Sequence, residues 1–246
     1  MKKNILDTII ASKKKEMVQK KKIYQSFIAS ICHPAKGDIG VIAEIKLKSP
    51  SGGRLGSRTG ILEKVKNYKR GTADCISIVT ENKFFGGDLK MISQVKRYID
   101  LPVLQKDFII HPDQVYEAKQ YGADALLLIA KLYKKDEIEK FIDLCNFLEI
   151  TPIVEVYDEK DVESIGRAKV VGVNARNLQD FTVDIENSCK LIKKLSKKYI
   201  VIGFSGIKSR EEVELYKKAG AKAVLVGTSA MRSKNASEFI RSLKGL

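Results

Sequence analysis

The sequence has no tryptophan, two histidines and only four cysteines in 246 residues. The cysteines are widely separated and form no C-x-x-C pair: Cys32, Cys75, Cys145 and Cys189. So few soft ligands argue against a zinc site, and the scattered spacing argues against a disulfide framework. We therefore expect reduced, mostly buried cysteines in a cytoplasmic protein that holds no metal.

Long apolar runs are also missing. No segment approaches the ~18 apolar residues of a membrane span, so no membrane partner is expected. The lysine-rich N-terminus lacks the apolar h-region of a secretory signal, and none is expected here.

Acidic residues are fewer than basic ones, 30 against 45, which gives a net charge of +15. Such a charge suits nucleic acid, a membrane surface or an acidic small molecule. The lysines are dispersed over helix-like segments, and no basic run is interleaved with aromatic residues. Solvated helix faces explain this pattern, so we expect no nucleic-acid partner. A nucleic-acid-binding protein remains an alternative that only the net charge supports.

Short apolar runs alternate with helix-like stretches along the chain. The runs occupy residues 41–45, 75–79, 102–105, 125–130, 152–156, 170–174, 199–204 and 223–227. The helix-like stretches occupy residues 61–70, 89–99, 112–122, 135–148, 158–165, 185–196, 209–220 and 236–245. Gly122 and Gly220 follow two of these stretches as expected C-caps.

Continuous apolar strands, rather than alternating ones, indicate burial on both faces and a parallel sheet. Eight strand–helix units in a chain of this length predict a (β/α)8 TIM barrel, an α/β fold. A doubly wound open sheet is the alternative, which the lack of a G-x-G-x-x-G after the first strand disfavours. We expect residues 1–246 to form one barrel domain. Residues 1–38 form its N-terminal helical extension: one amphipathic helix over residues 4–27, capped by Asn4, then a loop over 33–38.

Polar side chains gather where the predicted strands end, which is where such barrels build their active sites. They are Glu44, Lys46, Thr80, Glu81, Lys106, Asp107, Lys131, Glu155, Asn174 and Arg176. Because strand side chains alternate, Glu44 and Lys46 can both face the barrel mouth. Taken alone, Glu44 and Lys46 could form a structural ion pair, and Lys106 could be an ordinary surface lysine. Together the charges predict a site for a charged ligand.

Two turns at the ends of the last two strands predict a phosphate site. They carry Ser205 and Gly206 in the first turn, and Gly227 and Thr228 in the second. Barrels often bind phosphate with these loops and the start of a short extra helix, which "GTSAMR" (227–232) supplies. Simple turns are the alternative. We expect the ligand to be a phosphorylated small molecule.

Several segments in this order resemble the indole-3-glycerol phosphate synthase family of tryptophan biosynthesis. They are "AEIKLKSPSGG", "TENKFFGG", "LPVLQKDFIIHPDQVYEAKQYGADALLLIA", "VGVNARNL", "SGI" and "VGTSAMR". The resemblance covers nearly the whole chain, including the leading "ILDTIIASKKKE". It implies a lyase that closes the indole ring of 1-(2-carboxyphenylamino)-1-deoxyribulose 5-phosphate with loss of carbon dioxide and water. It also implies that no cofactor is used.

The resemblance also implies roles for individual residues. Lys106 matches the catalytic lysine, Lys46 the cation for the substrate carboxylate, and Glu44 and Glu155 the two acid–base carboxylates. The matching substrate-binding positions are Asn174 and Arg176 for orientation, Ser49, Gly206, Gly227 and Thr228 for phosphate, and Phe85 and Phe108 beside the substrate.

Two positions depart from the family pattern. The turn after Ser-Pro-Ser holds Gly52-Gly53, and Phe204 stands before "SGI" where the family carries a glutamate. We expect an active enzyme, because the other two carboxylates and both lysines remain. We also expect a monomer, with association with other enzymes of the pathway as the alternative. A catalytically impaired barrel that binds phosphorylated ligands is an alternative. Another is a phosphosugar enzyme such as phosphoribosylanthranilate isomerase, which needs a Cys/Asp pair at strand ends, and no cysteine ends a predicted strand.

Overall fold

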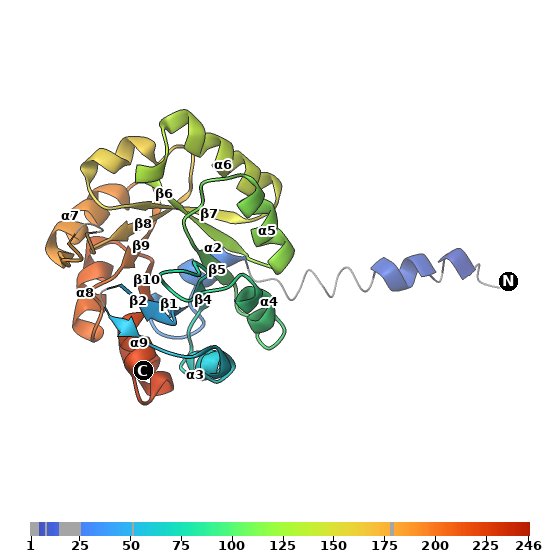
Figure 1. The fold of residues 1–246 in the computed structure, drawn as a ribbon, viewed down its shortest axis with the longest axis horizontal. Coiled ribbons are helices and arrows are strands. Elements are labelled where there is room, and N and C mark those ends of the chain that lie inside the picture. Colours follow the sequence, from blue (N-terminus) through green and yellow to red (C-terminus); the bar gives the residue numbers. More distant parts are fainter. Residues whose placement is uncertain (1–4, 8, 15–25, 51, 178–179) are drawn as a thin grey trace.

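The eight predicted strands form a closed parallel barrel in the computed structural model, which describes residues 5–7, 9–14, 26–50, 52–177 and 180–246 (Figure 1). The barrel strands are β1 Gly40–Ile45, β4 Cys75–Val79, β5 Val103–Lys106, β6 Ala125–Ile129, β7 Thr151–Val156, β8 Val170–Asn174, β9 Ile200–Phe204 and β10 Ala223–Val226. Each strand pairs with the next along the chain, and β10 pairs with β1 to close the ring. The (β/α)8 prediction is confirmed.

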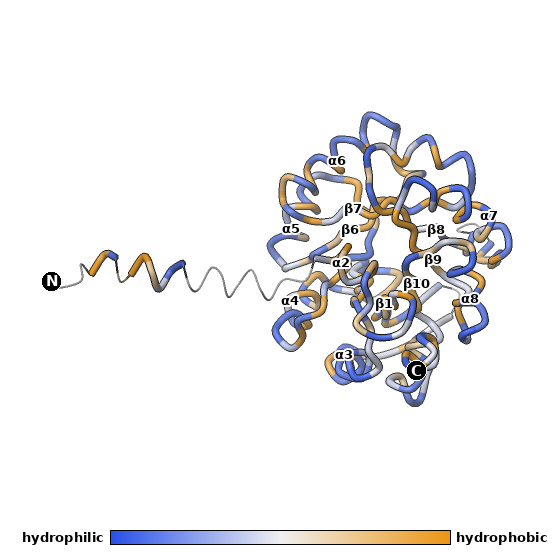
Figure 2. Tube along the Cα trace, turned by 180° about the vertical axis from the view of Figure 1, so that it is seen from behind, coloured by the Kyte–Doolittle hydropathy of each residue, from blue (hydrophilic) through white to orange (hydrophobic). Residues whose placement is uncertain are grey.

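The strands are mostly apolar because each packs on two faces. One set of side chains, including Ile42, Leu104 and Ile202, fills the barrel interior. The alternate set, including Val41 and Leu126, packs outward under the helices. Figure 2 shows the result as apolar strands at the centre and polar helix surfaces outside. Polar side chains at inward positions are therefore exceptions that need a partner or a ligand.

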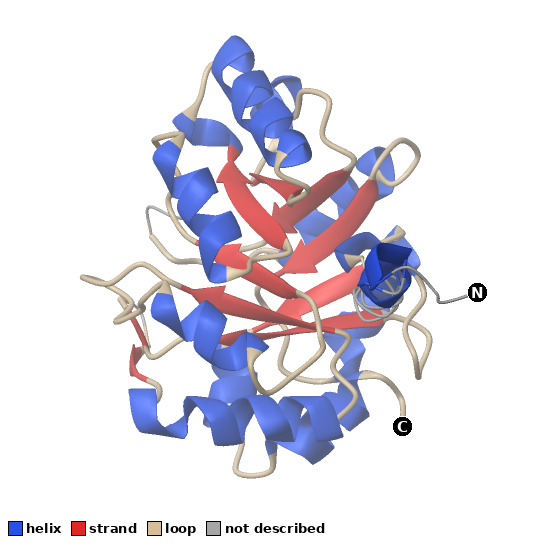
Figure 3. Cartoon of the chain, turned by 90° about the vertical axis from the view of Figure 1, so that its right-hand side faces the viewer, coloured by secondary structure: helices blue, strands red, loops and turns tan. Residues whose placement is uncertain are grey.

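Helices surround the barrel, which Figure 3 shows from the side. The α-helices are α2 Phe27–Cys32, α3 Ile61–Arg70, α4 Lys90–Lys96, α5 Asp113–Tyr121, α6 Lys135–Phe147, α7 Ile185–Leu195, α8 Arg210–Ala219, α9 Thr228–Arg232 and α10 Ala236–Leu243. Gly122 and Gly220 end α5 and α8 in the left-handed conformation, with φ of 91° and 106°, as predicted. In the described part of the chain, no helix has the length and apolar character needed to cross a membrane.

The remaining elements are short. They are β2 Lys48–Ser49, β3 Gly53–Arg54, η1 Arg58–Gly60, η2 Ala130–Leu132 and η3 Glu159–Ser164. The helix-like stretch predicted over 158–165 is a 3₁₀-helix, η3. Asp158 and Asp161 bond back to backbone N–H groups within this tight turn, which competes with α-helical bonding.

The predicted N-terminal helix is described in part. Residues 5–7 and 9–14 are helical and exposed, while Asn4 and residues 15–25 lie outside the described residues. The single helix expected through Phe27 is wrong at its end, because Ser26 has extended backbone and caps a new helix, α2. Phe27 and Ile31 of α2 pack against the apolar barrel interior. The division into a barrel and an extension over 1–38 stays a prediction.

Candidate active site

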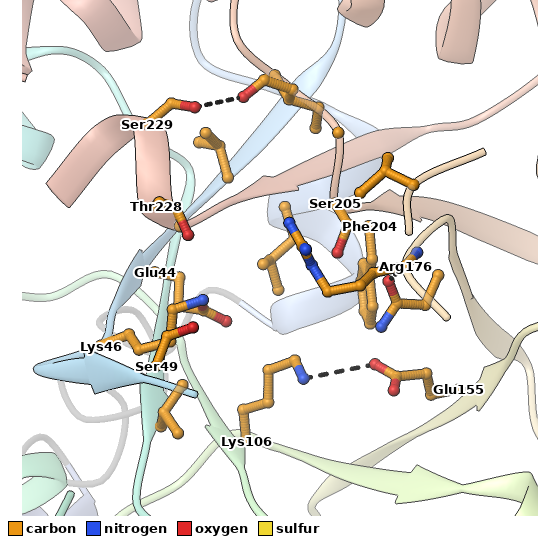
Figure 4. Close-up of a pocket in the computed structure, with 18 of the residues that line it drawn as sticks. Glu44, Lys46, Ser49, Lys106, Glu155, Arg176, Phe204, Ser205, Thr228 and Ser229 are labelled. Carbon is orange, nitrogen blue, oxygen red and sulfur yellow. Dashed lines mark hydrogen bonds and ion pairs between the residues drawn. The ribbon is translucent and has the colours of Figure 1, made fainter. Parts of the chain in front are cut away.

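A cavity of about 680 Å³ opens where the carboxyl ends of the barrel strands meet, and every residue predicted to be catalytic or to bind substrate lines it. Figure 4 shows part of this lining. These residues are Glu44, Lys46, Ser49, Phe85, Lys106, Phe108, Glu155, Asn174, Arg176, Ser205, Gly206, Gly227 and Thr228. The structure therefore brings together side chains from β1, β5, β7 and β8 and from the turns after β9 and β10.

Two ion pairs stand inside this cavity. Lys46 Nζ lies 3.0 Å from Glu44 Oε1, and Lys106 Nζ lies 3.5 Å from Glu155 Oε2. Burial by itself lowers the pKa of Lys106, but Glu155 and Glu44 outweigh it, so that this pKa is raised above its ordinary 10.5. Lys106 thus carries its proton throughout the neutral range. Each charge of these two pairs thus has an opposite charge beside it, which offsets the cost of placing it at the end of an apolar strand.

Glu155 is almost fully buried, at 1% exposure. The Tyr157 hydroxyl donates a hydrogen bond to its Oε1, while Oε2 accepts no hydrogen bond and faces Lys106. Burial, and then the charge of Glu155, raise the pKa of Tyr157, so the phenol stays protonated and remains a donor.

Phe204 forms part of the apolar floor of the cavity and is 1% exposed. Its ring lies over Gly172 of β8, where a Cβ would come within 2.5 Å of the ring atoms. The glycine therefore makes room for the phenyl ring. An apolar surface stands at this position, and Figure 4 shows it behind Arg176.

The turns after β9 and β10 have the geometry of an anion site. Ser205 and Gly206 have positive φ values of 68° and 77°, and Gly227 precedes α9. A Cβ on Gly227 would lie 2.3 Å from Glu44 Oε1, so only glycine fits there. Ser229 Oγ donates to the Ile207 carbonyl at 2.7 Å and ties the two turns together.

Aromatic and polar side chains complete the cavity wall. The rings of Phe85 and Phe108 lie 6.3 Å apart. Asn174 Oδ1 accepts the backbone N–H of Arg176 at 3.0 Å, and Arg176 Nη1 donates to the Phe181 carbonyl. Asn174 thus orients the start of the loop that carries Arg176.

Three strand-end residues that the sequence singled out form hydrogen bonds or ion pairs with other groups and do not line the cavity. Lys131 bonds Asp158 at 2.9 Å and lies over the ring of Tyr157, outside the cavity lining. Thr80 donates to Asp107, and Glu81 accepts three backbone N–H groups of the following loop. A strand end alone did not reveal which way these side chains turn.

The sequence missed Tyr157, Lys208, Glu212 and Arg232, all of which line the cavity. Arg232 Nη2 donates to the Gly52 carbonyl at 2.9 Å and joins α9 to the β2–β3 hairpin. It ends the "GTSAMR" segment, so its place beside the predicted phosphate turn was the available signal. The only sequence signal for Tyr157 was its position two residues after Glu155, which places both side chains on the same face of an extended strand.

Paired acids and cations at the mouth of a barrel, beside glycine-lined anion turns, define an acid–base enzyme that acts on a phosphorylated small molecule. The model of the indole-3-glycerol phosphate synthase family matches residues 2–243. The chain belongs to this family.

Relatives named indole-3-glycerol phosphate synthase are similar over most of the chain. The protein of Caldanaerobacter subterraneus subsp. tengcongensis is 36% identical over 223 residues, covering 85% of this chain and 86% of its own. That of Acetivibrio thermocellus is 35% identical over 212 residues, covering 85% and 82%. That of Endomicrobium trichonymphae is 34% identical over 235 residues, covering 95% and 90%.

A solved structure of 3-hexulose-6-phosphate synthase has a TM-score of 0.66 with 16% identity, covering 84% of this chain and 99% of its own. At this identity the likeness shows the barrel fold alone.

Proposed function

We propose that the ring closure of the family takes place in this cavity, with Lys106, Glu155, Glu44 and Lys46 as its acid–base residues. The activity of the family is that of a carboxy-lyase of tryptophan biosynthesis, which forms indole-3-glycerol phosphate from its phosphorylated anilino sugar. The observation that carries the assignment is the placement of two Lys–Glu pairs, at 3.0 and 3.5 Å, in one cavity with the glycine turns.

Ring closure begins with attack of an aromatic carbon on the sugar carbonyl, whose oxygen gains negative charge. Lys106 is a buried cation that can donate a hydrogen bond to this oxygen and then a proton. Its raised pKa keeps the proton in place until that charge develops. Glu155 beside it can take a proton during dehydration.

The substrate carboxylate requires a cation before it leaves as carbon dioxide. Lys46 is that cation, and binding the substrate carboxylate would draw it from Glu44, at present 3.0 Å away. Glu44 is then available as a second proton acceptor.

The direct test uses the absence of tryptophan from the protein. Indole fluorescence then reports the product against a background of tyrosine alone. Purified protein should generate this signal from the anilino sugar phosphate. A stable baseline at high enzyme concentration would refute the assignment.

The phosphate turns predict a binding effect at Gly227. Gly227→Ala places a methyl group 2.3 Å from Glu44 Oε1. We expect KM to rise about tenfold, a loss of roughly 1.4 kcal/mol of binding, and inorganic phosphate to compete with substrate in the wild type. Gly60→Ala, where the nearest atom is 3.6 Å away, is the control. An unchanged KM together with no competition by phosphate would place the phosphate elsewhere.

Phe204 favours a second candidate function, the impaired barrel that only binds phosphorylated ligands. We expect an active wild type, because the two Lys–Glu pairs remain. Phe204→Glu should alter the pH–rate profile, since an added carboxylate in the cavity favours the charged form of Lys106. It should also lower thermal stability, because it buries a charge where Phe204 is 1% exposed.

The control is Phe204→Leu, which keeps the position apolar. An inactive wild type with activity restored only in Phe204→Glu would establish the binding barrel instead. The isomerase alternative loses support, because no cysteine is among the described lining residues.

Location and assembly belong to the same proposal. All four cysteine thiols are free, which agrees with a reducing compartment such as the cytoplasm. The monomeric state stays a prediction of the sequence, with association with pathway enzymes as the alternative.

A further inference from the structure

Tyr157 is one of the lining residues that neither the strand-end pattern nor the family roles account for. It lies one residue beyond β7, and its hydroxyl donates to Glu155 Oε1. The other oxygen of that carboxylate, Oε2, is buried, accepts no hydrogen bond and lies 3.5 Å from Lys106 Nζ. One oxygen of Glu155 is thus held, and the other faces the reacting space.

The other carboxylates in the described lining are engaged elsewhere. Asp107 accepts from Thr80 and from the Phe108 N–H at 2.8 Å. Glu212 accepts from the N–H and the hydroxyl of Ser209, at 2.7 and 2.9 Å, where it caps α8. These bonds hold their carboxylates in loop and helix caps.

Glu44 is the remaining carboxylate and is paired with Lys46. Glu155 differs from Asp107 and Glu212 because its Oε2 is buried, accepts no hydrogen bond and has only the Lys106 ammonium beside it, at 3.5 Å. A buried carboxylate oxygen that accepts no hydrogen bond is costly, which points to a proton or a substrate group as a further partner beside Lys106.

We propose that Tyr157 is the positioning residue of Glu155, which fixes Oε1 so that Oε2 exchanges the proton in the family reaction. This inference rests on the proposed role of Glu155 in that reaction. Tyr157 keeps its own proton throughout, and the proton taken by Oε2 comes from the substrate.

Tyr157 is itself fixed, as a positioning residue must be. Its backbone N–H donates to Asp161 Oδ2 at 2.7 Å, and its hydroxyl also interacts with the Asn174 side chain. Lys131 Nζ lies 5.1 Å from the centre of its ring. Contacts on three sides leave the phenol little freedom, so the direction of its hydroxyl is set by the fold.

The charged surroundings of Glu155 are few. The neighbouring strands place Ile129 of β6 and Gly172 of β8 beside it in register, and neither is charged. Lys106 of β5 is its cation, and Glu44 of β1 acts on that same lysine. Loss of the Tyr157 hydrogen bond should therefore be felt directly at Glu155.

The phenyl ring of Phe204 supports the need for a well-positioned Glu155. With a phenyl ring on β9, the acid–base work on this side of the cavity falls to Glu155. A carboxylate that carries this work needs a fixed direction, because small misplacements of a catalytic group cost large factors in rate.

The test is Tyr157→Phe, which removes only the hydroxyl. We expect kcat to fall roughly ten- to a hundredfold with KM changed much less. The acid limb of the pH profile of kcat/KM should move to higher pH, because the ionised carboxylate loses a donor that favours it. Tyr133→Phe is the matched control: it is a part-buried tyrosine with a raised pKa whose hydroxyl donates to the Ile109 carbonyl outside the cavity lining.

Glu155→Gln distinguishes the positioning role of Tyr157 from the catalytic role of Glu155. If this variant is inactive while folded Tyr157→Phe keeps the wild-type kcat and acid limb, the positioning role is overturned and the proposed function stands. If Glu155→Gln is fully active, both the role of Glu155 and the inference built on it are overturned.

A second pair of variants covers poor folding of Tyr157→Phe. Tyr157→His keeps a hydrogen-bond donor on a ring, whereas Tyr157→Leu has none. The proposal expects a higher kcat for the histidine variant. Equal kcat values in the two folded proteins would overturn it.

Discussion

Replacing Lys106 with alanine is expected to lower kcat by roughly 10²- to 10⁴-fold, the range that general acid–base catalysis contributes, while the barrel stays folded. Lys106 ends β5 and faces Glu155 across the cavity at 3.5 Å. Its loss removes the cation that meets the carbonyl oxygen and also leaves Glu155 buried without its partner. The product signal of the indole assay measures kcat, and circular dichroism checks the fold.

Lys106→Arg tests whether charge alone suffices. Arginine keeps a cation beside Glu155 but does not release its proton in proteins. We expect kcat of Lys106→Arg to remain far below the wild-type value. This result would show that the lysine acts as a proton donor and not only as a positive charge. Lys140→Ala, an exposed lysine of α6, is the control and should match the wild type. Turnover within about threefold of the wild type in Lys106→Ala, far below the effect of a lost general acid, would contradict the assignment.

Replacing Lys244 with methionine is expected to lower the free energy of unfolding by about 3–5 kcal/mol, the cost of breaking one partner out of a buried ion pair. Lys244 is 1% exposed, and its Nζ lies 2.7 Å from Asp74 Oδ2 and 2.9 Å from the Thr72 carbonyl. Asp74 also accepts the Val41 N–H of β1 at 2.8 Å. The pair thus ties the C-terminal segment to the first two barrel strands. Denaturant unfolding measures the loss.

The pH dependence of Lys244→Met follows from Asp74. Burial raises the pKa of Asp74 above its ordinary 3.8 even with Lys244 beside it. A carboxyl whose pKa is raised by folding costs stability as the pH rises and it ionises, and the cost disappears when it is protonated. The deficit should therefore be largest at neutral pH and shrink toward pH 3.8.

Asp74→Asn in the Lys244→Met background should recover part of the loss at neutral pH, because no buried charge remains. Lys218→Met, on the exposed face of α8, is the control. A deficit that stays constant with pH, or that Asp74→Asn deepens, would show that Lys244 acts through packing and not through its charge.

The sequence by itself determined the barrel and the position of its site. Runs such as 125–129 are apolar at every residue, and this local pattern already indicates burial on both faces. Side-chain alternation placed Glu44 and Lys46 on one face, and the structure pairs them at 3.0 Å. These features depend on neighbours one or two residues apart, so a linear chain displays them.

Only the tertiary structure decided which side chains meet across the barrel. Lys106 and Glu155 come from different strands, and the ring of Phe204 fits over Gly172 because β8 pairs with β9. The Lys244–Asp74 pair joins residues 170 positions apart. Such contacts are set by how the strands close and stagger around the barrel.

Near the strand ends, local sequence also could not fix direction. Lys131 and Tyr157 both follow strands, yet Lys131 bonds Asp158 outside the cavity lining, while Tyr157 turns its hydroxyl to Glu155. Beyond a strand the alternation of side chains stops, and the partner that best satisfies each polar group decides where it points. The hydrogen bonds that place Lys131 outside the cavity lining and Tyr157 within it therefore form only in the folded barrel.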